Sequence, residues 1–326
     1  MILTISIPTF NRCELLLELL ASLGRSGVGR FDDIEVCISD NCSTDGTQVA
    51  IAEYRKTAAF KIEYFRHEVP ILGNKNLAFA ASRGSGKFVW VIGDDDKVPA
   101  DALSKVHEYL RADLDYVVLN HAIYNSDFSK IKVKRWMSLN SDLYMSGRQQ
   151  AMENLGITPT FISAVVARRE ILNSISSLDL DKYALLAFNQ LYAFYSGLPE
   201  NARGVATAEN LLLARGGNSG NYNWNVLFVT NLGIILNDLM LDRSYNENSV
   251  RKALYMVMLK YQLPRVLNEA AEGRGSRELR RMAYPYYSRS LFFWCVLFPA
   301  TFAPTWLMRP VKRVKRALFM ILRRFE

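Results

Sequence analysis

Hydrophobic and polar positions follow two alternating patterns along the first 120 residues. Short runs of apolar and β-branched residues, each followed by a turn, are typical of buried strands and occur at 2–7, 34–39, 62–66, 88–92 and 116–120. Between these runs, apolar residues recur three or four positions apart, as in a helix, at 15–23, 45–54, 76–82 and 100–110. Strands that alternate with helices predict an α/β fold with a mostly parallel sheet.

The pattern is less regular between residues 121 and 225. Lysines alternate with apolar residues at 126–136, which indicates an edge hairpin. The glycine-rich run 215–221 predicts a mobile loop. The other elements expected here are a strand at 161–167, a helix at 183–195 and a strand at 211–214. We therefore expect the α/β part to consist of two halves, 1–120 and 121–225.

From Trp224 onward the apolar spacing is helical, so we expect an α/β domain at 1–225 and a helical region at 226–326. The 326 residues are 50% hydrophobic, which is enough for one large core or two modest ones and excludes a disordered or fibrous chain. The net charge of +8 divides into +12 for residues 251–326 and −4 for residues 1–250. The basic charge, which favours an anionic partner, therefore belongs to the C-terminal quarter.

The four cysteines lack the paired spacing of zinc sites and of secreted disulfide scaffolds, so we expect reduced thiols; they are Cys13, Cys37, Cys42 and Cys295. The apolar N-terminus is too short for a signal peptide and lacks a basic leader. We therefore expect it to be the first buried strand of a cytosolic domain.

Polar residues follow three of the expected strands, at 9–12, 40–47 and 94–96. Ligands of open α/β sheets bind beyond the carboxyl ends of the strands, so these segments predict a common site. Three consecutive carboxylates repel one another unless a cation offsets them, and Mg²⁺ or Mn²⁺ bridging a diphosphate would do so. The alternatives are a solvated acidic turn at 94–96, and helix caps for Asp40 or Asp45.

These motifs, in this order, resemble glycosyltransferase family 2: ISIPTFNR at 5–12, SDNCSTDGT at 39–47, Gly73 with Asn76 and Leu77, and Gly86-Lys87-Phe88 leading to the aspartates. The resemblance covers about the first 120 residues. It implies a GT-A fold, a Rossmann-like nucleotide-binding half with a mixed sheet. It also implies a nucleotide-sugar donor held in the first half and a divalent cation, Mg²⁺ or Mn²⁺.

The resemblance also implies roles for particular residues. Pro8 and Thr9 would line the base pocket, and Asp40 would accept a hydrogen bond from the base. Because a carboxylate only accepts, Asp40 need not distinguish uracil, thymine and cytosine. Asp94, Asp95 and Asp96 would be the DxD element that binds ribose, diphosphate and metal, with Asp95 and Asp96 nearest the metal. Further candidates for donor binding are Asn11, Arg12, Lys75 and Arg215.

Two of these candidates have plainer interpretations. Lys75 stands where many relatives carry arginine, and it is either a point charge near phosphate or a surface lysine. Arg215 begins the glycine-rich run, which is either a lid over the diphosphate or a surface linker.

The sequence departs from the family pattern where a general base is expected. Inverting members place an acidic pair about ninety residues after the aspartates, but residues 187–190 read Ala-Phe-Asn-Gln. The nearest acids are Asp179, Asp181 and Glu200, each of which is either the base or a surface residue. Arg135-Trp136 lacks the Gln-x-x-Arg-Trp context of processive members, which predicts the transfer of single sugars.

The C-terminal quarter suggests a membrane surface. Residues 290–308 are apolar, interrupted by Pro299 and Pro304, and flanked by basic residues on both sides. We expect a re-entrant or surface-lying hairpin there. Residues 311–325 have the pattern of a basic amphipathic helix on anionic lipid, and the alternative is a helix packed on the catalytic domain.

Taken together, these features predict a metal-dependent, non-processive glycosyltransferase at the cytoplasmic face of the inner membrane, peripheral or monotopic, without nucleic acid as a partner. The acceptor would be a lipid-linked saccharide of bacterial O-antigen or surface polysaccharide synthesis. The Gly-Asp-Asp-Asp sequence at 93–96 and the missing acidic pair resemble the abequosyltransferase-like branch, which implies a dideoxyhexose such as abequose. The alternatives are a non-catalytic membrane-bound module that recruits other assembly enzymes, and a nucleotidyltransferase.

Overall fold

The computed structural model describes residues 1–173, 186–217, 223, 225–242, 245–271 and 277–302. Its contacts divide the chain into two compact units. The first consists of Met1–Ala151 and Thr158–Gly220, and the second of Met152–Ile157 and the residues from Asn221 onward. The segment 152–157 thus belongs with the C-terminal part, which differs from the boundary expected from the sequence.

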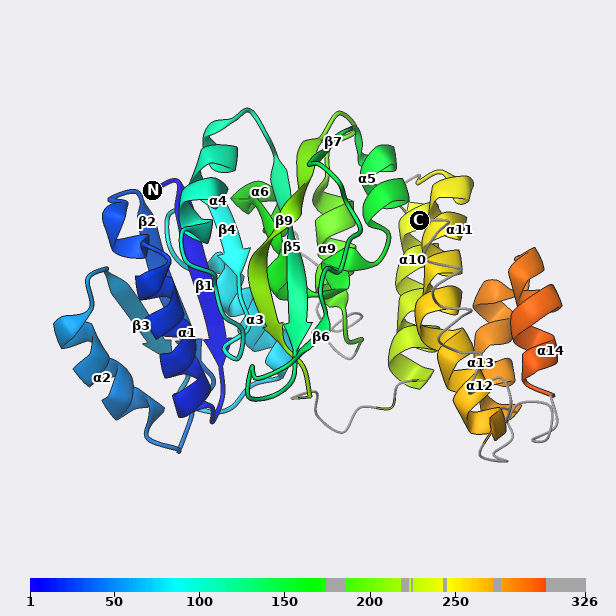
Figure 1. Ribbon diagram of the computed structural model, residues 1–326, viewed down its shortest axis with the longest axis horizontal. Helices are drawn as coiled ribbons and strands as arrows, with labels where there is room; N and C mark the ends of the chain where they lie inside the picture. Colours follow the sequence, from blue (N-terminus) through cyan, green and yellow to red (C-terminus); the bar gives the residue numbers. More distant parts are fainter. Residues whose placement is uncertain (174–185, 218–222, 224, 243–244, 272–276, 303–326) are drawn as a thin grey trace. The chain divides into compact units, whose positions relative to one another are not determined.

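A mixed sheet of nine strands forms the centre of the first unit (Figure 1). In spatial order the strands are β3 (Ile62–Arg66), β2 (Ile34–Asp40), β1 (Leu3–Thr9), β4 (Phe88–Val91), β8 (Val165–Arg168), β5 (Tyr116–Tyr124), β9 (Arg203–Arg215) and β7 (Leu143–Ser146), with β6 (Ile131–Val133) paired to β5. Strands β3, β2, β1 and β4 are parallel, whereas β8 runs antiparallel to both β4 and β5. The predicted α/β class with a mixed sheet is confirmed.

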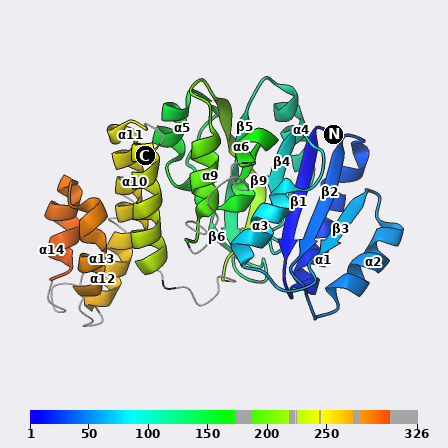
Figure 2. The same cartoon turned by 180° about the vertical axis from the view of Figure 1, so that it is seen from behind.

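Helices cover both faces of this sheet. Helices α1 (Cys13–Arg25) and α4 (Ala102–Arg111) lie on one face, and α3 (Gly73–Ser82), α6 (Arg169–Leu172) and α9 (Asn189–Gly197) lie on the other, which Figure 2 shows from behind. The first unit also contains α2 (Thr47–Thr57) and 3₁₀ turns at Val28–Arg30, Thr158–Thr160 and Ile162–Ala164, while α5 (Arg148–Leu155) begins in the first unit and ends in the second.

The two faces of strands β1 and β2 differ in chemistry. Leu3, Ile5 and Ile7 are fully buried in the hydrophobic core with the leucines of α1, as their alternation in the sequence requires. The intervening positions of β1 and β2 carry Thr4, Ser6, Glu35, Cys37 and Ser39, which are also buried. The second face of these strands is therefore a buried polar layer.

Several elements differ from the sequence-based expectation. Of residues 161–167, 162–164 form a 3₁₀ turn and only 165–168 form the strand β8. Strand β9 has 13 residues rather than the four expected. The sequence pattern missed most of this strand because its middle contains polar residues. One of them, Thr207, accepts a hydrogen bond from the backbone amide of Asn120 across an irregular stretch of the β5–β9 ladder. Polar side chains in strand interiors weaken the alternating signal that identifies a strand.

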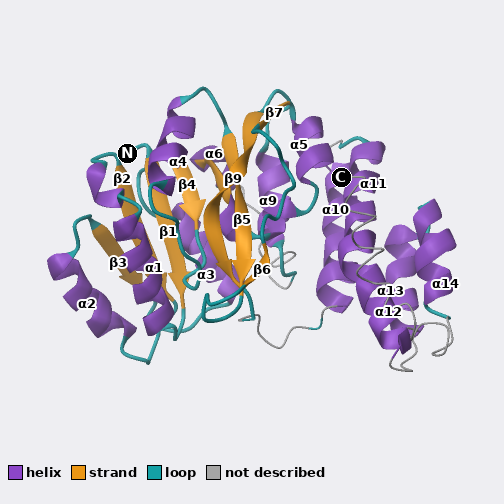
Figure 3. Cartoon of the chain, in the orientation of Figure 1, coloured by secondary structure: helices purple, strands orange, loops and turns teal. Residues whose placement is uncertain are grey.

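All described elements of the second unit after residue 221 are helical, as expected (Figure 3). They are α10 (Leu232–Asp242), α11 (Glu247–Val257), α12 (Leu263–Ala271), α13 (Arg277–Tyr287) and α14 (Phe298–Ala300), with π-helical turns at Val226–Asn231, Met258–Gln262 and Phe293–Leu297. Within the described residues, none of the helices combines the length and the apolar character that a membrane crossing requires. The expected basic helix at 311–325 lies outside the described residues.

Candidate functional site

The loops after β1 and β2 are held together by side chains of both. The backbone of Asn11 adopts a left-handed conformation (φ 52°), and its side-chain oxygen accepts a hydrogen bond from the Thr44 amide at 2.7 Å. The Asn11 amide in turn donates to the Ser43 hydroxyl at 2.9 Å. Asp45 accepts from the Cys13 amide at the start of α1 and from Thr47 at the start of α2. Asp45 therefore accepts hydrogen bonds at the N-termini of both α1 and α2.

Asp40, at the carboxyl end of β2, is fully buried and fixed from three sides. One carboxylate oxygen accepts from the Ser43 amide at 2.9 Å, and the other accepts from the Tyr64 hydroxyl. The Arg66 guanidinium lies 3.8 Å from the second oxygen and also donates to the Ser43 carbonyl. Burial and the Asp40 carboxylate raise the pKa of Tyr64, so this phenol stays protonated as the donor. Asp40 is thus a preoriented acceptor beside a positive group.

The aspartates that follow β4 point in different directions. The carboxylate of Asp94 accepts from the Thr9 hydroxyl at 2.8 Å and from Arg12 at 3.0 Å. Asp96 is buried, and its two oxygens accept from the Ser163 hydroxyl at 2.6 Å and from the Arg215 amide at 3.0 Å. Asp95 lies 3.4 Å from Arg12 and is the more open, since 18% of its side chain is exposed. The predicted convergence of the β1 and β4 ends is therefore observed.

Electrostatics at this turn disfavour three ionised carboxylates. Burial raises the pKa of Asp94, against the opposing effect of Arg12 and Thr9. Burial, with the Asp95 charge next in importance, raises the pKa of Asp96 to about 8. A divalent cation near Asp95 would remove this repulsion, and carboxylate oxygens are the ligands that Mg²⁺ and Mn²⁺ accept.

This shift of the Asp96 pKa predicts a pH dependence of stability in the metal-free protein. Because the folded pKa of about 8 exceeds the ordinary value of 3.8, the folded state retains a proton that the unfolded state releases between these values. The contribution of Asp96 to stability is complete below about pH 4 and is lost as the pH rises toward 8. We expect the melting temperature with chelator to fall between pH 5 and 8, and to fall less in Asp96→Asn. Equal slopes in the two proteins would contradict this explanation.

Arg215 is anchored rather than mobile. Its amide bonds Asp96, its Nε donates to the Asp95 carbonyl at 2.8 Å, and its Nη2 lies 2.6 Å from a carboxylate oxygen of Glu18. The side chain is 5% exposed, and Lys97 pairs with the same Glu18 at 2.8 Å. Arg215, the last residue of β9, therefore holds the backbone and side chains of the aspartate turn in place. The expectation that it belongs to a mobile loop is wrong, and residues 218–222 lie outside the described residues.

Of the other donor-binding candidates, Pro8 and Thr9 end β1 beside Asp40, since the β1–β2 register pairs Thr9 with Asp40. Lys75 lies in the first turn of α3, which follows the carboxyl end of β3. Their positions border the same edge of the sheet as the aspartates.

Of the candidates for a general base, only Glu200 lies within the described residues. Asp179 and Asp181 lie outside the described residues. Glu200 precedes the start of β9, pairs with Arg148 at 3.2 Å and is 87% exposed. Strand β9 spans 13 residues, about 40 Å at 3.3 Å each, and only its far end meets Asp96. The structure therefore argues against Glu200 as the base for a sugar bound at the aspartates.

Sequence reasoning missed four residues of this site: Glu18, Tyr64, Arg66 and Ser163. Ser163 lies in an apolar run, yet its hydroxyl donates to Asp96 and accepts from the Gly93 amide. Tyr64 and Arg66 read as ordinary strand residues of β3. The one feature of the sequence that could have indicated these residues is a polar residue within an apolar run. Such a residue does not reveal which side chain it will contact in the fold.

Known proteins resemble this chain in sequence and in fold. The sequence model of "Glycosyl transferase family 2" matches residues 4–175. The chain is 30% identical over 180 residues to abequosyltransferase RfbV of Salmonella typhimurium, a match that covers 52% of this chain and 54% of that protein. It is 33% identical over 105 residues to a GalNAc(5)-diNAcBac-PP-undecaprenol beta-1,3-glucosyltransferase of Campylobacter jejuni, covering 31% and 32%. The matches thus span about half and about a third of these relatives.

Solved structures with a similar fold include TarS 1–349 of S. aureus in complex with UDP-GlcNAc, with a TM-score of 0.64 and 15% identity, covering 97% of this chain and 92% of that one. The mannosyltransferase PcManGT of Pyrobaculum calidifontis, in complex with GDP-Man and Mn²⁺, has a TM-score of 0.53 and 15% identity, covering 96% and 86%. At these identities the likeness concerns the fold alone.

Proposed function

Because this chain belongs to glycosyltransferase family 2 and has its GT-A fold, we propose that it transfers a single sugar from a nucleotide-sugar donor to a saccharide acceptor. The observation that carries the proposal is that hydrogen bonds connect the segments at the carboxyl ends of β1, β2 and β4. Thr9 bonds Asp94, Asn11 bonds Thr44, and Asp40 is held beside them by Tyr64. Such a preformed edge is where open α/β sheets bind nucleotides.

In this proposal the base occupies the pocket of Pro8, Thr9 and Asp40. Asp40 accepts an N–H of the base, and the adjacent Arg66 offers a donor to a ring or carbonyl acceptor. Asn11 shapes the loop, while Arg12 and Lys75 supply positive charge for the diphosphate. TarS and PcManGT, which share the fold, were solved with UDP-GlcNAc and with GDP-Man.

The aspartate turn fits a divalent cation. Two adjacent carboxylates, Asp94 and Asp95, share one guanidinium, that of Arg12, and the carboxylate of Asp95 is partly open. When bound, Mg²⁺ or Mn²⁺ would neutralise charge on the diphosphate leaving group. Asp95 would hold the ion, while Asp94, bonded to Thr9 and Arg12, and Asp96, bonded to Ser163 and Arg215, would fix the turn around it. In the transfer itself, the bond between the anomeric carbon and the diphosphate oxygen breaks, and the nucleoside diphosphate leaves with the electron pair. The acceptor oxygen forms the new bond to that carbon, and its proton passes to solvent.

For the acceptor, we propose a lipid-linked saccharide of O-antigen or surface polysaccharide synthesis. The supporting observations are the names of the two relatives, one an abequosyltransferase and the other acting on a PP-undecaprenol saccharide. A dideoxyhexose such as abequose is the finer form of this proposal. The +12 charge of residues 251–326 suits binding to anionic lipid at the cytoplasmic face of the inner membrane, with 1–225 as the catalytic domain and 226–326 as the membrane-facing region.

Two measurements test this function. Thermal-shift screening with UDP-, CDP-, dTDP- and GDP-sugars, with and without Mn²⁺, should give stabilisation by one donor class. Incubation of that donor with extracted lipid-linked saccharides should release nucleoside diphosphate. Release of pyrophosphate would indicate a nucleotidyltransferase instead.

A non-catalytic recruiting module is the second candidate, favoured by the absence of an acid at 187–190 and by the remote position of Glu200. The same measurements separate it from the enzyme. A module would be stabilised by a nucleotide sugar without any turnover, whereas the enzyme requires both.

Tyr64→Phe is expected to weaken nucleotide binding about tenfold. The substitution removes a donor to the buried Asp40 carboxylate, a loss worth about 1–2 kcal/mol, and frees the carboxylate to rotate. Titration calorimetry with the nucleotide found in the screen measures the change. Tyr54→Phe on α2, another partly buried tyrosine, is the matched control. Equal affinities of the two variants would show that Tyr64 does not position Asp40.

A further inference from the structure

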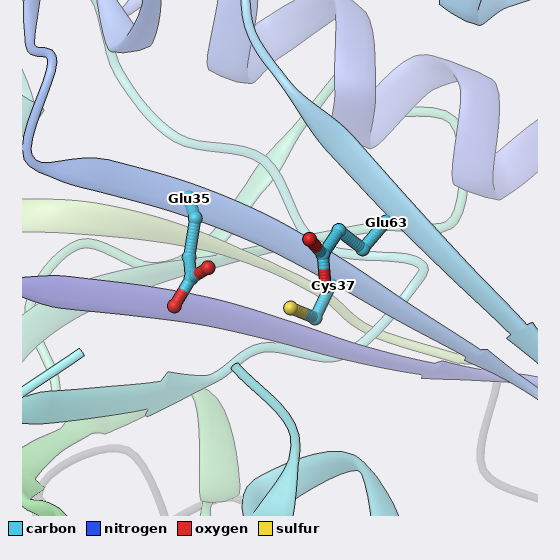
Figure 4. Close-up of side chains that lie close together, drawn as sticks. All are labelled: Glu35, Cys37 and Glu63. Atoms are coloured by element: carbon cyan, nitrogen blue, oxygen red, sulfur yellow. The ribbon is translucent and has the colours of Figure 1, made fainter. Parts of the chain in front are cut away.

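A second cluster of ionisable groups lies in the polar layer of the first unit, away from the aspartate turn. Glu35 and Cys37 of β2 project from the face opposite the hydrophobic core, as does Ser39, whose hydroxyl donates to Asn76 of α3. In the β2–β3 register Cys37 pairs with Glu63. Figure 4 shows the Cys37 sulfur between the carboxylates of Glu35 and Glu63.

The distances in this cluster suit coordination of one ion. One ligand atom from each of Glu35, Cys37 and Glu63 lies within 4.8 Å of the other two. Glu35 and Cys37 are buried, whereas 32% of the Glu63 side chain is exposed and gives an entry path from solvent. Cysteine thiolates and glutamate carboxylates are each ligands that Zn²⁺ accepts, at about 2.3 Å for sulfur and 2.0–2.2 Å for oxygen.

Ser6 supplies an independent observation. It is fully buried, and its Oγ has no hydrogen-bond partner among the residues that the structure describes. The β1–β2 register pairs Ser6 with Cys37, so the Ser6 side chain projects beside Cys37 from the same face of the sheet. A buried hydroxyl without a partner is costly and calls for an explanation, and an ion at the cluster would satisfy it.

Glu35 is preorganised for such a role. Every hydrogen bond that it accepts ends on one oxygen, Oε1, from Thr4 at 2.8 Å, from the Gly86 amide at 3.1 Å and from Ser85. Its other oxygen, Oε2, accepts none in the described structure. Similarly, Lys61 bonds one oxygen of Glu63, at 2.6 Å. Each carboxylate therefore keeps one oxygen for a ligand.

We propose that Ser6, Glu35, Cys37 and Glu63 form a binding site for a thiophilic divalent cation of the Zn²⁺ type. Binding forms the metal–sulfur bond and releases the thiol proton to solvent, so no oxidant or reductant is required. The ion would cross-link β1, β2 and β3. Cys37 lies three residues before Asp40 and Ser6 three before Thr9, about 10 Å along each strand, so the cross-link would stiffen the strands that carry the proposed base pocket.

Metal titration of the full, metal-free chain tests this site without any sugar-transfer assay. We expect one equivalent of Zn²⁺ to bind in competition with a chromophoric chelator, and Cd²⁺ to give the ultraviolet charge-transfer band of a Cd²⁺-bound thiolate. Cys37→Ser should abolish the band, and Glu63→Gln should lower Zn²⁺ affinity at least about tenfold. Millimolar Mg²⁺ should not compete, because it avoids thiolate ligands.

Two controls make the outcome decisive. Cys13→Ser and Cys42→Ser remove the half-buried thiols near the β1 and β2 loops and should leave both signals intact. Circular dichroism of Cys37→Ser and Glu63→Gln verifies that they fold. The proposal is overturned if the wild-type chain binds no equivalent of Zn²⁺, if folded Cys37→Ser retains the Cd²⁺ band, or if a control variant loses it. None of these results bears on whether the protein transfers sugar.

Discussion

Asp95→Asn is expected to lower the rate of sugar transfer at least about 100-fold, the usual cost of removing one group that stabilises transition-state charge. Asp95 is the most open of the three carboxylates, and with Asp94 it shares the guanidinium of Arg12. An amide in its place would weaken cation binding and leave the diphosphate charge unscreened. The measurement is the initial rate over a range of Mn²⁺ concentrations, and the variant should require more Mn²⁺ as well as turn over more slowly.

Asp101→Asn is the matched control for this substitution. Asp101 has a left-handed backbone, which asparagine also tolerates, and its side chain is 71% exposed. We expect its rate to stay within twofold of the wild type. If Asp95→Asn and Asp101→Asn transferred sugar equally well, the aspartate turn would not be the metal site.

The same substitution at Asp96 should act differently. Both oxygens of Asp96 accept hydrogen bonds from the chain, from Ser163 and from Arg215, so this side chain supports the turn rather than facing solvent. Asp96→Asn should therefore lose activity mainly through misplacement of Asp95. The sequence-based expectation places both Asp95 and Asp96 nearest the metal, whereas we propose that only Asp95 faces it.

Arg169→Met is expected to destabilise the first unit by about 3 kcal/mol. Arg169 stands at the start of α6, and its guanidinium donates to the carbonyls of Gly86, Ala81 and Arg83 and to the Thr4 hydroxyl, at 2.8–3.3 Å. Methionine fills similar space but removes the donor to the three carbonyls, at roughly 1–3 kcal/mol for each one that water cannot reach. The Thr4 hydroxyl keeps its hydrogen bonds with Glu35 and the Gly86 amide. Thermal unfolding should show a fall of roughly 6–12 °C.

Arg203→Met serves as the comparison. Arg203 pairs with Asp113 at the surface and is 56% exposed, so its loss should change stability by less than about 0.5 kcal/mol. A similar melting temperature for Arg169→Met and Arg203→Met would show that water or neighbouring groups satisfy the loop carbonyls, and that the Arg169 contacts contribute little.

Features that depend on short stretches of sequence, such as individual strands and the loops that follow them, could be predicted. Short runs rich in apolar and β-branched residues, each ended by a turn, predicted β1 to β4, and the polar residues after them predicted the convergence of Thr9 with Asp94. The partners of Asp96 could not be predicted, because Ser163 and Arg215 arrive from 67 and 119 residues away along the chain. The choice between base and surface residue for Glu200 could not be predicted for a related reason, since proximity in sequence to residues 187–190 does not show which end of a 13-residue strand it lies near.

The place of β8 in the sheet has a consequence for how the chain folds. Strand β8 lies between β4 and β5, although residues 92–115 connect those two directly and β8 follows only at 165–168. During synthesis the half made of β1 to β4 therefore emerges with the edge of β4 open. An open edge is a template for pairing with other chains, and pairings distant in sequence form slowly. Until β8 is synthesised, nascent chains therefore expose an edge on which other chains can pair.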